Sequence, residues 1–190
     1  MTHLTQPIGT TKALTKRDAL SRMLSRTSVA VPLGFLAMVF LAQVVIPLPF
    51  TPVPLSLGTL GALGAGALLG ARRGAVAATA YAVAGAVGFP VLAGFTSGLT
   101  IPSFGYVIGY VFAAVMVGTY AGRAGKFHWA TATAVVIAAT ATVYLFGVVW
   151  MNAMLHLGWS AAVAAGVTPF LVGDALKAVV VVGLLRAVKR

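Results

Sequence analysis

Long apolar stretches separated by short polar or basic connections make up the chain from residue 29 onward. Six stretches approach the roughly 20 residues that a helix needs to cross about 30 Å of hydrocarbon. They are residues 29–48, 55–71, 74–90, 104–122, 129–151 and 168–187. Residues 1–28 contain no long apolar run. The pattern therefore predicts a basic N-terminal tail, residues 1–28, followed by one all-α membrane domain of six transmembrane helices, residues 29–190.

The positions of the lysines and arginines agree with six crossings. Basic residues occur at both chain ends and in the connections between spans two and three and between spans four and five, but not in the other connections. Twelve of the 13 basic residues therefore fall on one side of the membrane, and the thirteenth is Lys177, well inside the last span. Because cytoplasmic loops carry the excess of lysine and arginine, we predict that both termini are cytoplasmic.

Composition supports a multi-pass protein of the cell membrane and argues against other classes. Hydrophobic residues form 60% of the chain and charged residues 8%, whereas a soluble domain is about half apolar and about a quarter charged. The net charge of +11 could suggest nucleic acid. The basic residues are dispersed between apolar spans and do not form one face, so we expect a lipid bilayer and no nucleic acid as the surroundings of this chain. The chain has no cysteine, which excludes disulfides and thiolate metal sites.

Asp174 and Lys177 are an acid and a base inside a predicted span. Thr168-Pro169 is a good helix start, with a hydroxyl N-cap and a proline at the first helical position, so the pair lies near the outer end of the last span. Residues three apart share a helix face. Two interpretations stay open: a structural pair that bonds across the bundle, or an anchor for a small ligand with an amide- or urea-like edge.

The two charge-free outer loops differ from ordinary short connections. Residues 47–54 contain four prolines, and residues 88–105 are rich in glycine, proline, phenylalanine and small hydroxyl residues. Irregular backbone at membrane depth is tolerated where it is buried in protein or lines a cavity. These loops are therefore either plain outer connections or a lid over a pocket for a ligand with a hydrophobic body.

Small residues on the first span, Ala30 and Gly34, allow either close packing within the chain or docking of a partner subunit. Enzyme classes find no support in the sequence. It has no Gly-x-x-x-x-Gly-Lys-Ser/Thr phosphate loop, no Gly-x-Ser-x-Gly elbow and no histidines at a metal-ligand spacing. We therefore expect no catalytic residues, no metal and no cofactor.

Several motifs resemble the BioY family, the biotin-binding S components of energy-coupling factor (ECF) transporters. They are Pro52-Val-Pro-Leu-Ser-Leu-Gly-Thr59, Gly70-Ala-Arg-Arg-Gly74, Gly85-Ala-Val-Gly-Phe-Pro-Val-Leu-Ala-Gly-Phe-Thr-Ser-Gly98, Gly105-Tyr106 with Gly109-Tyr110, and Pro169-Phe-Leu-Val-Gly-Asp-Ala-Leu-Lys-Ala178. The resemblance covers about residues 45–185. Two places depart from the family pattern. Gly58 stands where the family usually has Gln, and Ile101-Pro-Ser-Phe-Gly-Tyr106 replaces a Gly-Pro-Thr-Gly-Gly-Tyr run.

The resemblance implies an S-component bundle that binds biotin near its outer face. It implies a transmembrane coupling protein (T component) and two cytosolic ATPases as partners. Asp174 would accept from the ureido N–H groups of biotin, and Lys177 would donate to the ureido carbonyl or to the valerate carboxylate. The other expected ligand contacts are Ser56, Thr59, Phe89, Phe95, Thr96, Ser97, Phe104 and Tyr106. The alternatives are an S component for another vitamin, such as thiamine, and a structural membrane protein without a transport function.

Overall fold

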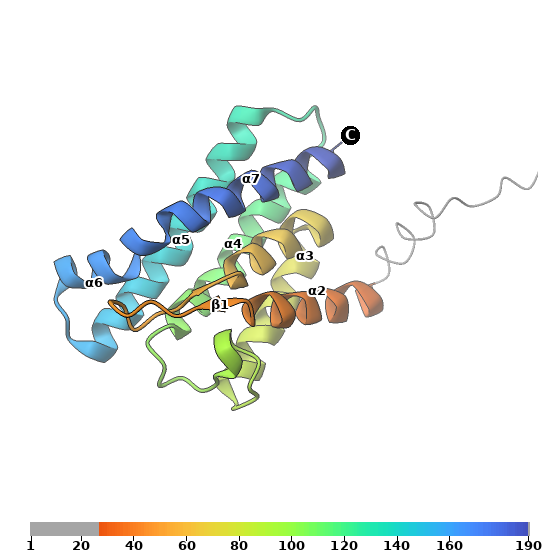
Figure 1. The fold of residues 1–190 in the computed structure, drawn as a ribbon. Coiled ribbons are helices and arrows are strands. Elements are labelled where there is room, and N and C mark those ends of the chain that lie inside the picture. The colour runs from red at the N-terminus through yellow and green to blue at the C-terminus, as the bar shows by residue number, and fades with distance from the viewer. Residues whose placement is uncertain (1–26, 190) are drawn as a thin grey trace, which may run out of the picture.

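The computed structural model describes residues 27–189, and this part of the chain is built mainly from helices (Figure 1). In chain order the elements are α2 (Thr27–Ala42), β1 (Val45–Ile46), β2 (Leu55–Ser56), α3 (Gly58–Ala86), η1 (Ala93–Phe95), α4 (Phe104–Gly122), α5 (Trp129–Leu155), α6 (Trp159–Gly166), η2 (Thr168–Phe170) and α7 (Leu171–Val188). The helical class that the hydropathy pattern predicts is confirmed. Of the predicted N-terminal tail, residues 1–28, only Thr27 and Ser28 lie among the described residues, and both belong to α2.

A sharp bend at Gly70 divides α3 into two halves, residues 58–69 and 71–86. Gly70 has φ 80° and ψ 173°, a conformation that glycine adopts without the steric penalty of a Cβ. The chain reverses there, because a Cβ on Gly74 would lie only 3.0 Å from the Cα of Gly66. In a straight helix these two residues would be about 12 Å apart. The two halves correspond to the second and third predicted spans.

Large apolar side chains cover the outside of the bundle, and small residues fill the contacts between its helices. Phe40, Ile137 and Val179 are exposed, whereas Ala77 and Ala113 are completely buried. This arrangement suits a protein in lipid, because hydrocarbon tolerates an apolar exterior and small residues let helices approach closely. By length and composition, two helices of the described residues, α4 and α5, could each cross a bilayer. Six crossing segments stay a prediction.

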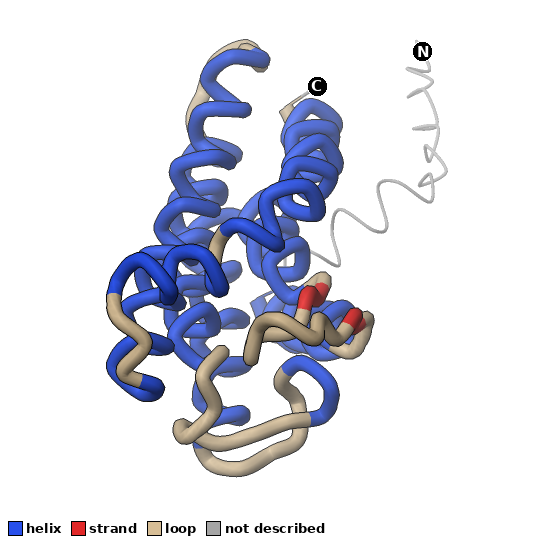
Figure 2. Tube along the Cα trace, turned by 60° about the vertical axis from the view of Figure 1, so that its left-hand side comes forward, coloured by secondary structure: helices blue, strands red, loops and turns tan. Residues whose placement is uncertain are grey.

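The bundle has two ends of different character. At one end the bend of α3 touches α4, where a Cβ on Gly118 would lie 2.5 Å from the Cα of Ala71. Lys189 donates to the carbonyl of Arg123, 2.8 Å away, and so joins the end of α7 to the end of α4. We call this the basic end, since it holds Arg72, Arg73, Arg123, Lys126, Arg186 and Lys189. The irregular connections and α6 lie at the other end, which we call the loop end (Figures 1 and 2).

Three details differ from the prediction. Helix α2 ends at Ala42, before the predicted end of the first span, and the chain then enters a short antiparallel hairpin that pairs Val45–Ile46 with Leu55–Ser56. A further helix, α6, occupies the predicted connection between the last two spans. Thr168 starts the 3-10 turn η2, but its hydroxyl makes no capping hydrogen bond, and α7 begins at Leu171.

Candidate ligand-binding site

Asp174 and Lys177 lie side by side on the first turns of α7 and point into the bundle. Only 8% and 6% of their surfaces are exposed, and Lys177 Nζ lies 2.7 Å from Asp174 Oδ1. The prediction that both share one helix face is confirmed. A buried charge is costly unless it is paired and fully hydrogen-bonded, so this pair needs further partners.

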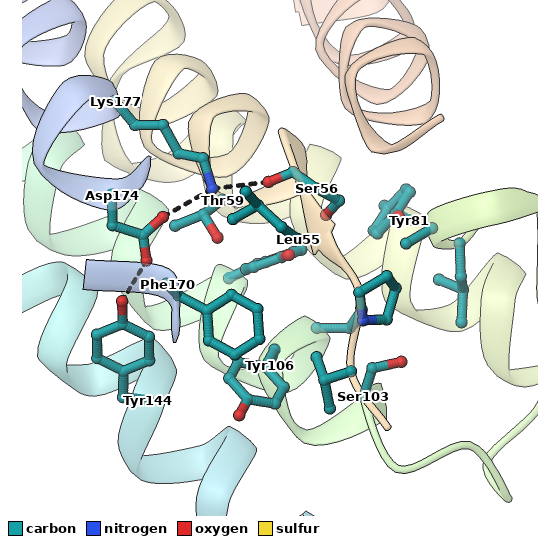
Figure 3. A pocket seen from close by; sticks show the side chains of 16 residues that line it. Leu55, Ser56, Thr59, Tyr81, Ser103, Tyr106, Tyr144, Phe170, Asp174 and Lys177 are labelled. Atoms are coloured by element: carbon teal, nitrogen blue, oxygen red, sulfur yellow. Dashed lines mark hydrogen bonds and ion pairs between the residues drawn. The ribbon is translucent and has the colours of Figure 1, made fainter. Parts of the chain in front are cut away.

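Two other elements supply those partners (Figure 3). The Tyr144 hydroxyl on α5 donates to Asp174 Oδ2. Lys177 Nζ also donates to the backbone carbonyl of Ser56 on β2, 2.7 Å away. An ammonium has three N–H donors and a carboxylate about four acceptor positions. These protein contacts occupy two of each, which leaves hydrogen-bonding capacity on both charges for a ligand.

A cavity opens beside the charged pair: the centre of a water molecule can reach about 40 Å³ of it, and the empty space is about 530 Å³ when the open mouth is counted. Figure 3 shows Asp174 and Lys177 on one side of this cavity, with the rings of Tyr106 and Phe170 beyond them. The lining residues are Val53, Pro54, Leu55, Ser56, Thr59, Tyr81, Leu92, Ala93, Ser103, Tyr106, Val107, Tyr110, Tyr144, Phe170, Asp174 and Lys177. Most of the wall is aromatic or aliphatic. The cavity therefore suits a small ligand with one strongly polar edge and an apolar body.

Tyrosines whose hydroxyls have protein partners form part of the wall. Tyr106 and Tyr110 lie about one turn apart on α4 and therefore share a face. The Tyr106 hydroxyl donates to the carbonyl of Gly166, 2.7 Å away. The Tyr110 hydroxyl is hydrogen-bonded with the side chains of Thr59 and Ser56. Because each ring is held at its polar tip, the apolar face that it offers to a ligand is fixed in place.

The second outer loop, residues 87–103, contributes to the cavity wall and is tied to α2 by Gln43. The Nε2 group of Gln43 donates to the carbonyls of Val91 and Leu92, each 3.2 Å away. Its Oε1 accepts from the backbone N–H of Phe95 at 2.8 Å. Leu92, between these contacts, is almost fully buried and lines the cavity. These contacts favour the interpretation of the loop as a cover over a pocket.

The chain matches a known protein family over nearly its whole length, since the BioY family model covers residues 11–190. The chain belongs to the BioY family. The biotin transporter BioY of Rhizobium etli is 36% identical over 153 residues, which cover 75% of this chain and 81% of that protein. The biotin transporter BioY of Rhodobacter capsulatus is 37% identical over 159 residues, 74% of this chain and 80% of that protein. The biotin transporter BioY of Thermotoga maritima is 32% identical over 138 residues, 71% of this chain and 80% of that protein.

A solved structure shares the fold of this BioY chain. It is the 2.1 Å crystal structure of the S-component for biotin from an ECF-type ABC transporter. The match has a TM-score of 0.75, covers 92% of this chain and 94% of the other, and has 24% sequence identity. The predicted S-component-like bundle is therefore confirmed as a fold, while the number of crossings and their orientation stay predictions.

Half of the predicted ligand contacts of this BioY chain line the cavity. They are Ser56, Thr59, Tyr106, Asp174 and Lys177. They come from β2, α3, α4 and α7, so the fold brings together residues that lie far apart in the sequence. Their contact with a ligand stays a prediction.

The other predicted contacts lie outside the cavity lining. Phe89 and Phe95 are 61% and 69% exposed. Thr96 donates its hydroxyl to a carbonyl of its own loop at 2.9 Å, and Ser97 is half-buried beside it. Phe104 is buried against an α5 tryptophan, with ring centroids 5.6 Å apart. In this structure the loop phenylalanines do not wall the cavity, because an irregular loop has no periodicity that fixes which side chains point inward.

Ala30 and Gly34 pack inside this BioY chain. Ala30 is completely buried. A Cβ on Gly34 would lie 2.6 Å from Leu69 Cδ1 and 3.1 Å from the Cβ of Ala77, both on α3. The α2–α3 contact therefore uses these small residues, and docking of a partner subunit at Ala30 and Gly34 stays a prediction.

Tyr144, Tyr110 and Phe170 are cavity residues that sequence reasoning missed. Tyr110 follows Tyr106 by about one helical turn, a spacing that indicates a shared face. Tyr144 is the phenol of the predicted span 129–151, and a hydroxyl at membrane depth needs a protein partner. A search for that partner could have led to the carboxylate of Asp174.

Gly58 packs against the tip of the Tyr110 side chain. A Cβ at this residue would lie 2.7 Å from the hydroxyl oxygen of Tyr110 and 3.3 Å from Ser56 Oγ. The Tyr110 hydroxyl thus fills the space where a longer side chain at position 58 would begin.

Proposed function

We propose that this chain captures biotin at the outer face of the cytoplasmic membrane as the S component of an ECF-type importer. Membership of the BioY family, the similarity to biotin transporters of several organisms and the fold shared with a biotin S-component support this function. The site adds an independent argument. It offers a buried acid and base beside an apolar cavity, and biotin combines a polar ureido ring with an apolar ring and chain.

The buried Asp174–Lys177 pair is the observation that carries the proposal. Asp174 has unused acceptor positions and takes the two ureido N–H groups of biotin. Lys177 has one remaining N–H, which donates to the ureido carbonyl. Tyr106 and Phe170, whose rings lie 6.4 Å apart in an edge-on arrangement, hold the fused rings of biotin by apolar contact.

The membrane arrangement and the partners belong to the same proposal. We infer six crossing segments with both termini in the cytoplasm, since the basic residues collect at one end of the bundle and the cavity lies toward the other. The partners are a T component and two cytosolic ATPases. The chain has no phosphate-binding loop of its own, so uphill import needs ATPases supplied by other subunits.

Binding of radiolabelled biotin to the purified protein tests this function. Asp174→Asn and Lys177→Ala should each weaken binding about 10- to 100-fold, because each removes a hydrogen bond between a charged group and the ligand, which contributes about 1.5–3 kcal/mol. Excess thiamine or riboflavin should not compete with biotin. Tight biotin binding by both variants would show that the pair is not the anchor, and competition by thiamine would favour an S component for another vitamin.

A purely structural role for the pair is the second candidate, because Tyr144 and Ser56 already connect it to α5 and β2. The reciprocal variant Asp174→Lys with Lys177→Asp distinguishes the two. A pair that only compensates its own charges keeps their attraction after the exchange and preserves function, provided that the melting temperature shows that the variant folds without the bond to the Ser56 carbonyl. A ligand site loses its affinity, because the donors and the acceptors have changed places.

A further inference from the structure

Tyr81 lines the cavity but takes no part in the contacts proposed for the ureido ring. It lies in the second half of α3, and only 1% of its surface is exposed. Its ring lies beside that of Tyr110, with ring centroids 6.4 Å apart. One helical turn further along α3, Leu92 of the second outer loop packs on Gly85. Packing therefore holds the Tyr81 ring in place in the cavity wall.

The hydroxyl of Tyr81 differs from those of the other cavity tyrosines. Tyr106, Tyr110 and Tyr144 each direct the hydroxyl to a protein group. Within the described part of the chain, the Tyr81 hydroxyl has no hydrogen-bond partner. Among the described side chains, the polar atom that is sealed in the interior without a partner is Asn152 Oδ1, so the Tyr81 hydroxyl can still be reached from the cavity. A buried phenol of this kind requires a hydrogen-bond acceptor, which a ligand can supply.

Tyr81 lies on the side of the cavity away from the charged pair. Figure 3 shows Asp174 and Tyr144 at one side and Tyr81 and Ser103 at the other. Ser103 precedes α4, and its hydroxyl makes no capping hydrogen bond to that helix. One side of the cavity therefore carries the ion pair, and the other carries hydroxyl groups that are available to a ligand.

The hydroxyl side of the cavity has no cation of its own. Among the described residues that line the cavity, Lys177 is the single cation. Two of its N–H groups donate to Asp174 and to the Ser56 carbonyl, and the proposed function gives the third to the ureido carbonyl. The second outer loop, residues 87–103, contains no charged residue. A ligand carboxylate on this side therefore meets neutral donors.

We propose that the Tyr81 hydroxyl donates a hydrogen bond to the valerate carboxylate of bound biotin. This inference rests on the proposed function, in which Asp174 and Lys177 hold the ureido ring. The ureido group and the carboxylate lie at opposite ends of biotin, as the charged pair and Tyr81 lie on opposite sides of the cavity. A hydrogen bond to an ionised acceptor is about twice as strong as one between neutral groups. Tyr81 gives up no protein hydrogen bond to form it.

Three ligands and one substitution test this contact. The ligands are biotin, desthiobiotin, which lacks the sulfur, and a biotin analogue with a methyl group in place of the carboxylate. Competition with radiolabelled biotin measures the Kd of each ligand. Tyr81→Phe should weaken the binding of biotin and of desthiobiotin about ten-fold or more, because each loses a hydrogen bond to a charged group. The methyl analogue should bind Tyr81→Phe at least as tightly as the wild type, because in the wild type it leaves the phenol without a partner.

Controls separate this contact from a general change of the cavity. The unliganded Tyr81→Phe protein should have the melting temperature of the wild type, since the substitution removes no hydrogen bond within the described chain. Tyr120→Phe removes a hydroxyl that donates to the His128 carbonyl at the basic end, and should bind all three ligands like the wild type. As a second measurement, the infrared carboxylate band of biotin labelled with ¹³C at that carbon should differ between the complexes of Tyr81→Phe and the wild type.

Three results would refute the carboxylate contact and leave the proposed function intact. Equal weakening of all three ligands in Tyr81→Phe would show that the residue only shapes the cavity wall. Weakening of biotin but not of desthiobiotin would assign the hydroxyl to the ring sulfur. Unchanged binding of biotin, with an unchanged infrared band, would mean that other groups hold the carboxylate. A wild-type protein that binds neither biotin nor desthiobiotin would refute the proposed function itself, and this inference with it.

Discussion

At the scale of single residues, Asp174 depends on neighbours from two helices. Lys177 lies on the same helix and compensates its charge, whereas Tyr144 reaches it from α5. Each carboxylate oxygen therefore has its own protein partner. A carboxylate held in this way keeps its orientation before a ligand arrives, which lowers the entropic cost of binding.

Tyr144→Phe removes one of these partners and leaves the ring in place. We expect the Kd for biotin to rise about ten-fold or more, because a hydrogen bond to a charged group contributes about 1.5–3 kcal/mol. Equilibrium binding of labelled biotin measures the change. Tyr120→Phe is the matched control, since the Tyr120 hydroxyl donates to the carbonyl of His128, 3.2 Å away, at the basic end. Equal affinity in Tyr144→Phe and the wild type would show that Asp174 does not need this bond.

At the scale of elements, the second outer loop depends on one side chain that directly follows α2. Gln43 lies in the turn between α2 and β1, and its amide reaches three backbone groups of the loop. The loop has a bond of its own from Leu92 N–H to the carbonyl of Thr96 at 3.1 Å, and its Gly98 N–H donates to the carbonyl of Gly85 in α3 at 2.7 Å. The Gln43 contacts hold the part of the loop on both sides of Leu92, so they favour a position of Leu92 in the cavity wall.

Gln43→Leu should therefore loosen the loop without unfolding the bundle. Leucine keeps the size of the side chain but can neither donate to the carbonyls of the loop nor accept from Phe95. We expect backbone amides of residues 91–98 to exchange hydrogen about ten-fold faster, since each lost bond contributes about 0.5–1.5 kcal/mol, and bound biotin to dissociate faster. Hydrogen exchange followed by mass spectrometry measures the exchange rates of the amides in the loop and in α5. The rates in α5 should not change. Unchanged exchange in the loop would mean that its own bonds suffice.

The sequence predicts the elements of this chain better than the inward-facing residues of its loops. Helical spans follow from hydropathy, and the shared face of Asp174 and Lys177 follows from their spacing. The bend at Gly70 lies where the basic residues separate the second and third spans. Phe89 and Phe95 show the limit: their loop is irregular, so which rings face the cavity depends on tertiary contacts such as those of Gln43. Helix α6 was missed because its apolar run is too short to register as a span.

At the scale of the whole molecule, the two ends of the bundle carry different chemistry. The loop end holds uncharged loops beside the cavity, where the opposite charges of Asp174 and Lys177 cancel. The basic end holds the remaining charges of the described chain, with Arg186 stacked 5.0 Å from the ring of Trp129 and Lys189 4.8 Å from that of Tyr120. Cations and aromatic rings of this kind are typical of a cytoplasmic membrane interface. The separation predicts one orientation: the cavity opens outward and the basic end faces the cytoplasm.

Single cysteines test this orientation directly, because the chain has none of its own. Leu157 lies in the connection between α5 and α6 at the loop end and is 40% exposed. Lys126 lies between α4 and α5 at the basic end and is exposed. A membrane-impermeant maleimide added to intact cells should label Leu157→Cys and should label Lys126→Cys only after the membrane is permeabilised. The reverse pattern would invert the molecule and place the cavity on the cytoplasmic side. The α5 helix between the two positions has 27 residues and is long enough to cross the membrane. Labelling of both positions in intact cells would mean that it does not cross.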